Sequence, residues 1–117
     1  IENRARFEGR KRMPEAVSMW SIMVLLSRFE SFPNVVIETA AAGLPLITSN
    51  VGGIAEVVPK ELLCDPLTVD ELAKHMRALL ANPVKLAREA ASYSQHIRKT
   101  CSALEMSQKI SDFYASA

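Results

Sequence analysis

The sequence has few aromatic residues and cysteines and no long apolar run. Aromatic residues make up 6% of the 117 residues, and there are 2 cysteines. Cys64 and Cys101 are far apart and belong to no Cys/His cluster, which excludes a zinc-finger spacing and a disulfide framework. We expect both to be free thiols, as in a cytoplasmic protein. The longest apolar run, residues 22–26, is far too short to cross a bilayer, so any membrane association would be peripheral.

The sequence also lacks an excess of either charge. With 14 basic and 13 acidic residues its formal net charge is +1, which argues against broad electrostatic binding to nucleic acid. The charge is uneven, however, because residues 1–12 carry five basic and two acidic side chains. This basic segment is either a solvated strand edge or a contact for an anionic partner.

Short apolar segments alternate with longer amphipathic ones along the chain. Hydrophobic residues make up 49% of the sequence, enough for one aliphatic core. The alternation predicts an α/β fold, a Rossmann-like parallel sheet with flanking helices. The expected strands are residues 5–8, 22–27, 45–49 and 62–64. Residues 22–26 are apolar at every position, which predicts a central strand covered on both faces.

Proline and glycine delimit the first two predicted helices. Pro14 is expected to open a short helix over residues 14–20. Pro33 is expected to be the first residue of a helix over residues 33–42. Gly43 then fits the left-handed position just past its end.

Three further helices are expected in the second half of the chain. Their predicted starts are Thr68 with Glu71, Asn82 with Pro83, and Ser102 with Glu105. The last helix carries an apolar stripe of Met106, Ile110, Phe113 and Tyr114. We expect all three helices to pack, and we assign them no chemistry.

The loop after residue 27 carries the first candidate site residues. In open α/β sheets, ligands bind beyond the carboxyl ends of the strands. If a helix begins at Pro33, the N–H groups of Asn34 and Val35 are free and point outward, a ready seat for phosphate. Glu38 lies one turn later and suits a ribose diol. Glu30 lies before the helix, where it can bind sugar hydroxyls.

The loop after residue 49 carries the second group of candidates. Gly52 and Gly53 permit close backbone approach to a ligand or a tight strand-to-helix turn. Glu56 is expected to cap or brace this loop. The two histidines, His75 and His96, are expected to be solvated and non-catalytic.

The ordered set of motifs in residues 25–58 resembles the C-terminal domain of GT-B glycosyltransferases, specifically the retaining enzymes of family 4. The hallmark comprises two glutamates separated by seven residues and a small-residue helix, then a Gly-x-Pro turn, a strand and a Gly-Gly-x-x-Glu loop. In this chain the hallmark residues are Glu30, Glu38, Gly43, Pro45, Gly52, Gly53 and Glu56.

The resemblance implies a role for each matching residue. Glu30 would be the catalytic-site glutamate that contacts the transferred sugar, and Glu38 would hold the nucleotide ribose. Backbone groups at Phe32, Asn34 and Val35 would contact the donor sugar and diphosphate, as would the glycines Gly52 and Gly53. No cofactor or metal is implied, because the helix terminus and basic residues replace the cation used in other glycosyltransferase folds.

The implied reaction is transfer of a sugar from a UDP- or GDP-sugar to a hydroxyl of a glycan or glycolipid. The resemblance places residues 1–117 in part of the donor-binding domain, with the acceptor domain and the first part of this domain outside the chain. We therefore expect the isolated chain to be inactive. The expected location is the cytoplasm or the inner face of the membrane.

Three other functions compete with transfer. A nucleotide-sugar-binding module without catalysis would use the same seat. A glycosidase could use Glu30 and Glu38 as its carboxylate pair, but it would leave the amides of Asn34 and Val35 unused. A nucleotide-sugar epimerase of similar fold is not expected to carry the glutamate pair.

Overall fold

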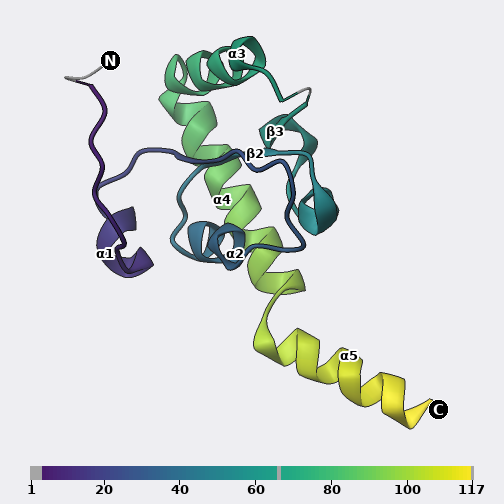
Figure 1. Ribbon diagram of the computed structural model, residues 1–117. Helices are drawn as coiled ribbons and strands as arrows, with labels where there is room; N and C mark the ends of the chain where they lie inside the picture. The colour runs from purple at the N-terminus through teal and green to yellow at the C-terminus, as the bar shows by residue number, and fades with distance from the viewer. Residues whose placement is uncertain (1–3, 66, 117) are drawn as a thin grey trace.

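The computed structural model describes residues 4–65 and 67–116 as a small parallel sheet flanked by helices (Figure 1). In chain order the regular elements are α1 (Met13–Val17), β1 (Met23–Leu25), α2 (Asn34–Ala41), β2 (Leu46–Ser49), η1 (Gly52–Glu56), η2 (Lys60–Leu62), β3 (Leu63–Cys64), α3 (Val69–Leu80), α4 (Pro83–Thr100) and α5 (Ala103–Ala115). The predicted α/β class is confirmed.

The sheet has the order β1-β2-β3, and both pairs of strands are parallel. Val24 pairs with Ile47, and Ser49 pairs with Cys64. Every residue of β2 is buried, as expected for a middle strand with apolar side chains on both faces. Parallel strands all end at the same edge, so the loops after β1, β2 and β3 meet there.

Helix α4 runs the length of the body and fastens α2 to it (Figure 1). The buried Tyr93 hydroxyl donates to the Val36 carbonyl oxygen at 2.9 Å, and the Arg98 guanidinium donates to the Ala41 carbonyl oxygen at 2.7 Å. One α4 side chain thus holds the start of α2 and another its end. Burial raises the pKa of Tyr93, with a smaller contribution from Cys101, so the hydroxyl stays protonated to a higher pH than that of an exposed tyrosine.

The end of α2 confirms the prediction made from Gly43. Gly43 has φ +68°, and its N–H donates to the Ala40 carbonyl oxygen. The Leu44 N–H donates to the Thr39 carbonyl oxygen, which completes the pattern typical of a glycine-terminated helix. The start of α2 differs by one residue, since Pro33 is the extended N-cap with ψ 130° and Asn34 is the first helical residue. The Pro33 carbonyl oxygen accepts the Val36 N–H at 3.0 Å.

One strand prediction was wrong, and another strand prediction and one helix prediction were wrong in part. Residues 5–8 form no strand, because no neighbouring strand among the described residues pairs with them, and Phe7 is fully exposed. Strand β1 is half-buried at the edge of the described sheet, with one paired neighbour, and is not a covered central strand. Helix α1 starts at Met13 and ends at Val17, so Pro14 is its second residue and residues 18–20 lie outside it.

The three predicted N-caps in the second half of the chain are confirmed. The Thr68 hydroxyl accepts the Glu71 N–H, the Asn82 side chain accepts the Lys85 N–H, and the Ser102 hydroxyl accepts the Glu105 N–H. The prediction that all three helices pack was wrong for α5. No residue of α5 is buried, and Figure 1 shows it extending away from the body beyond α4. An apolar stripe shows that a helix can bury one face, but it does not show which other element, if any, packs against that face.

Candidate functional site

Hydrogen bonds between neighbouring loops tie the carboxyl edge of the sheet together. Ser49, at the end of β2, bonds to the backbone of Ser27 beyond β1. On the other side, the Asn50 side-chain amide donates to the Asp65 carboxylate at 2.7 Å. The loops after all three strands are therefore linked through the loop after β2, and every site residue predicted from the sequence lies in the first two loops or in α2.

The N-terminus of α2 opens at this edge. Pro33 offers no side-chain cap, and the Val36 N–H is satisfied by the Pro33 carbonyl oxygen. The N–H groups of Asn34 and Val35 have no hydrogen-bond partner among the described residues. Free N–H groups at the positive end of a helix attract anions. The shift of the helix start from Pro33 to Asn34 leaves this predicted seat intact.

Glu30 lies in the loop before α2 with a half-buried side chain. Its carboxylate oxygen Oε1 accepts a hydrogen bond from the Ser27 hydroxyl at 2.7 Å. A bond of this length to a carboxylate is a strong one. The carboxylate keeps further acceptor positions for hydroxyl groups of a ligand.

Gly52 and Gly53 dock directly on the backbone of the Glu30 loop. Gly52 has φ +55°, and a Cβ atom there would lie 1.8 Å from the Glu30 carbonyl oxygen. The Gly53 N–H donates to the Ser31 carbonyl oxygen at 2.9 Å. The glycines thus permit close contact with another segment of the same chain, and this contact fixes the loop that carries Glu30.

Two other predicted residues lie beside Gly53. Phe32 is half-buried, with its ring atom Cδ2 3.5 Å from the position a Gly53 Cβ would take. The exposed Glu56 has Oε1 4.0 Å from the same position. Glu56 therefore lies next to the glycine loop, and its role as a brace of that loop stays a prediction.

Glu38 is exposed on α2 and lines a hollow of about 450 Å³ between α1 and α2. The other lining residues are Met13, Pro14, Val17, Ala41 and Ala42. A carboxylate at the edge of an apolar hollow suits a molecule with one flat apolar part and one diol. Sequence reasoning found Glu38 but missed the hollow, because the contribution of α1 depends on how that helix packs.

A larger hollow of about 680 Å³ lies at the opposite end of β2. Gly43, Leu44 and Pro45 line it just before the strand, together with Trp20 and one face of α4. None of the predicted site residues borders it, so size alone does not mark the site.

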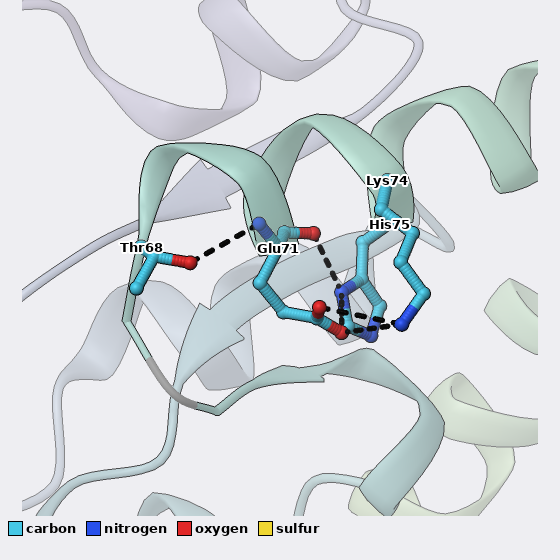
Figure 2. A network of polar contacts seen from close by, with 4 residues as sticks. All are labelled: Thr68, Glu71, Lys74 and His75. Carbon is cyan, nitrogen blue, oxygen red and sulfur yellow. Dashed lines mark hydrogen bonds and ion pairs between the residues drawn. The ribbon is translucent and has the colours of Figure 1, made fainter.

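The polar network at the start of α3 is local to that helix (Figure 2). The Glu71 carboxylate pairs with Lys74 at 3.1 Å and lies 3.5 Å from His75 Nδ1. The same Nδ1 lies 3.0 Å from the Glu71 carbonyl oxygen, to which it donates. The prediction that His75 is solvated was wrong, because these contacts hold it half-buried against its own helix, whereas His96 is exposed as predicted.

The described part of the chain has neither a cluster of metal-binding side chains nor a membrane-spanning helix. In residues 4–65 and 67–116, no three His, Cys, Asp or Glu side chains gather in a way that would hold a metal ion. In the same ranges, no helix is both long and apolar enough to cross a membrane.

The structure thus places the free N-terminus of α2 and Glu30 at the carboxyl edge of a parallel sheet, with Glu38 one turn further along the helix. A sequence model described as "Glycosyl transferases group 1" matches residues 1–82. The chain belongs to this family.

Relatives and a solved structure agree with the family. The chain is 40% identical over 77 residues to "Glycogen synthase" of Mycobacterium tuberculosis (strain CDC 1551 / Oshkosh), covering 63% of this chain and 19% of that protein. It is 44% identical over 59 residues to "N-acetyl-alpha-D-glucosaminyl L-malate synthase" of Bacillus anthracis, covering 50% and 16%. Among solved structures, it is similar to sucrose-phosphate synthase from Thermosynechococcus elongatus, a GT-B glycosyltransferase. The TM-score is 0.64 and the identity 29%, over 80% of this chain and 26% of that one. The chain thus spans about a fifth of the length of its curated relatives.

Proposed function

We propose that this chain supplies the donor-binding part of a retaining glycosyltransferase that uses a nucleoside diphosphate sugar. The observation that carries the proposal is the pair of free N–H groups on Asn34 and Val35, with Glu30 before them and Glu38 one turn after them. Membership of the group 1 family supports it. The glycan or glycolipid acceptor is bound by a part of the protein outside these 117 residues.

Each group has a chemical task in this proposal. The bond between the anomeric carbon and the diphosphate breaks, and a bond from that carbon to the acceptor oxygen forms on the same face. The acceptor hydroxyl proton leaves with the departing diphosphate. Negative charge grows on the diphosphate as the bond breaks, and the N–H groups of Asn34 and Val35 stabilise it without reorganising. The Glu30 carboxylate accepts hydrogen bonds from hydroxyls of the transferred sugar.

The hollow beside Glu38 takes the nucleoside. Its apolar lining from α1 and α2 suits a UDP or GDP base, and the Glu38 carboxylate can accept both hydroxyls of the ribose. Helix α2 thereby connects the nucleoside to the diphosphate seat, since Glu38 lies one turn from Asn34. Phe32, Gly52 and Gly53 shape the part of the site nearest the sugar.

The test is a titration of this chain with UDP, GDP and their sugar conjugates, followed by the amide signals in ¹⁵N–¹H NMR spectra. We expect shifts centred on Asn34, Val35 and Gly52 for one of the two bases. Glu38→Ala should remove them, because the ribose loses its acceptor. Asp112→Ala removes an exposed carboxylate from α5 and should leave them unchanged.

The product of the complete open reading frame separates the alternatives. Sugar transfer by that product, with none by the 117-residue chain, would support the proposal. Binding without transfer would favour a non-catalytic binding module. If no nucleotide shifts Asn34 or Val35 in either protein, the assignment of the seat is wrong.

We also propose that transfer needs no metal ion, since the positive end of α2 faces the diphosphate. Activity of the complete product should therefore survive EDTA, and restoration by Mg²⁺ or Mn²⁺ after EDTA would contradict this. A location in the cytoplasm or at the inner face of the membrane stays a prediction.

A further inference from the structure

Ser27 makes the one hydrogen bond found on the Glu30 side chain among the described residues. Its hydroxyl donates to Glu30 Oε1 at 2.7 Å across three positions of the loop. A loop glutamate has several rotatable bonds, and an ionised carboxylate accepts hydrogen bonds but cannot donate them. A fixed hydroxyl donor therefore selects one orientation of the carboxylate before any ligand arrives.

Ser49 fixes Ser27 in turn. The Ser49 hydroxyl oxygen accepts the Ser27 N–H at 3.1 Å, and the same hydroxyl donates to the Ser27 carbonyl oxygen at 2.7 Å. Ser27 lies beyond the last residue of β1, where the strand ladder no longer holds the backbone. Ser49 is buried at the end of the middle strand, so its side chain replaces the missing ladder bonds.

The main chain of Glu30 is held from the other side. Gly52 lies against the Glu30 carbonyl group, and the Gly53 N–H bonds to the next carbonyl oxygen, that of Ser31. Both ends of the glutamate are thus tied to the loop after β2. One tie is to its backbone through the glycines, and the other is to its carboxylate through Ser27 and Ser49.

We propose that Ser27, anchored by Ser49, is a positioning residue that holds the Glu30 carboxylate toward the donor sugar. This inference rests on the proposed function, in which Glu30 receives the sugar hydroxyls. Only one lone pair of Oε1 is used by Ser27, so the remaining acceptor positions stay available. An acceptor already ordered in its bound orientation gives tighter and more selective binding, because little side-chain freedom is lost when the sugar arrives.

The test compares affinities for nucleotides with and without the sugar, by calorimetry on the product of the complete open reading frame. The probes are UDP and GDP and their conjugates with glucose, mannose and N-acetylglucosamine. In Ser27→Ala we expect the affinity for UDP or GDP without a sugar to stay within about twofold of the wild-type value. The additional affinity given by the sugar should fall about tenfold, the order expected when one hydrogen bond to a charged group is lost. Ser27→Thr keeps the hydroxyl and should retain most of the additional affinity given by the sugar.

A double-mutant cycle separates positioning from a general structural effect. In a Glu30→Ala background, Ser27→Ala should cause no further loss in sugar affinity, because its effect acts through Glu30. Ser116→Ala removes a serine hydroxyl that bonds to a carbonyl oxygen at the exposed end of α5, and it should change neither affinity.

The outcomes distinguish the two proposals. If the diphosphates bind but Ser27→Ala leaves the sugar contribution intact, or acts equally in the Glu30→Ala background, the positioning role is wrong and the nucleotide site stands. A wild-type protein that gains no affinity from any of the sugars also overturns the role. If the wild-type protein binds no nucleotide, the proposed function fails, and this inference fails with it.

Discussion

Gly52 shows how one residue can decide the geometry of the site. Its backbone has φ +55°, a conformation that side-chain-bearing residues adopt only under strain. Its Cα also packs against the Glu30 carbonyl group so closely that no Cβ fits. Two independent constraints, the positive φ and the lack of space for a Cβ atom, therefore select glycine here. A larger residue could be accommodated only by a shift of the backbone that carries Glu30.

Gly52→Ala should destabilise the chain by about 3 kcal/mol. This figure combines the cost of holding alanine in a left-handed conformation with the cost of the clash between its Cβ and the backbone. Gly43→Ala is the matched control, because Gly43 has a similar φ of +68° but open space where the Cβ would be. It should cost about 1 kcal/mol. Equilibrium urea unfolding measures both. Equal losses for the two variants would show that the contact with Glu30 contributes nothing.

The sequence predicted these residues better than it predicted their contacts. The sequence identified Gly52 and Gly53 as a place of close backbone approach, and it offered a ligand or a tight turn as the reason. In the structure the glycines approach the backbone of the Glu30 loop. Ser27 and Ser49 were expected at the ends of neighbouring strands, yet neither was singled out. Their bond depends on the register of the parallel strands, which no local pattern encodes.

At the scale of elements, α2 depends on α4 for its position. The Tyr93 hydroxyl reaches the Val36 carbonyl oxygen in the first turn of α2, the same turn that presents the free N–H groups of Asn34 and Val35. Packing by residues more than fifty positions later thus orients the anion seat. Capping residues predicted the limits of α2 to within one residue, but long-range packing decided its placement.

Tyr93→Phe should lower the free energy of unfolding by about 1 to 2 kcal/mol, because a buried hydrogen bond is lost. The raised pKa of Tyr93 adds a pH dependence. A group whose folded-state pKa is raised stabilises the fold below its unfolded pKa, about 10 for tyrosine. That contribution is lost as the pH rises above 10, at a rate of about 1.4 kcal/mol per pH unit. Urea unfolding between pH 8 and 11 should show this slope.

The control for this prediction is Tyr114→Phe, which changes an exposed tyrosine on α5. It should keep both the stability at pH 8 and the alkaline slope. If Tyr93→Phe retains the slope attributed to Tyr93, another group is responsible for it.

At the scale of the molecule, the sequence predicted the order of elements but not how each is covered. β2 is buried at every position although two of its four residues, Thr48 and Ser49, are polar, whereas β1 is apolar throughout and lies half-buried at the edge of the described sheet. Residues 5–8 have a strand-like pattern, but no described residue pairs with them. A hydrophobic pattern indicates which face of an element can be buried. Whether another element covers that face depends on the assembled fold.

Helix α5 exposes a set of large apolar side chains. Leu104, Met106, Ile110, Phe113 and Tyr114 are each at least half exposed, and the Phe113 and Tyr114 rings contact each other edge to face. The body of the chain therefore gains little from this helix, even though its N-cap is well formed by Ser102. The helix accounts for much of the long dimension of the chain, 57 Å against 31 and 29 Å.

Removal of residues 103–117 should change the free energy of unfolding of the remaining chain by less than about 0.5 kcal/mol, the range expected for surface changes. Ile97→Ala serves as the positive control, because Ile97 is buried at the end of α4 and its truncation should cost about 2 to 4 kcal/mol. Urea unfolding of the three chains under one condition makes the comparison. A loss above about 1 kcal/mol on removal of α5 would mean that its apolar face packs on the body in solution, since only burial against that body couples an exposed helix to its stability.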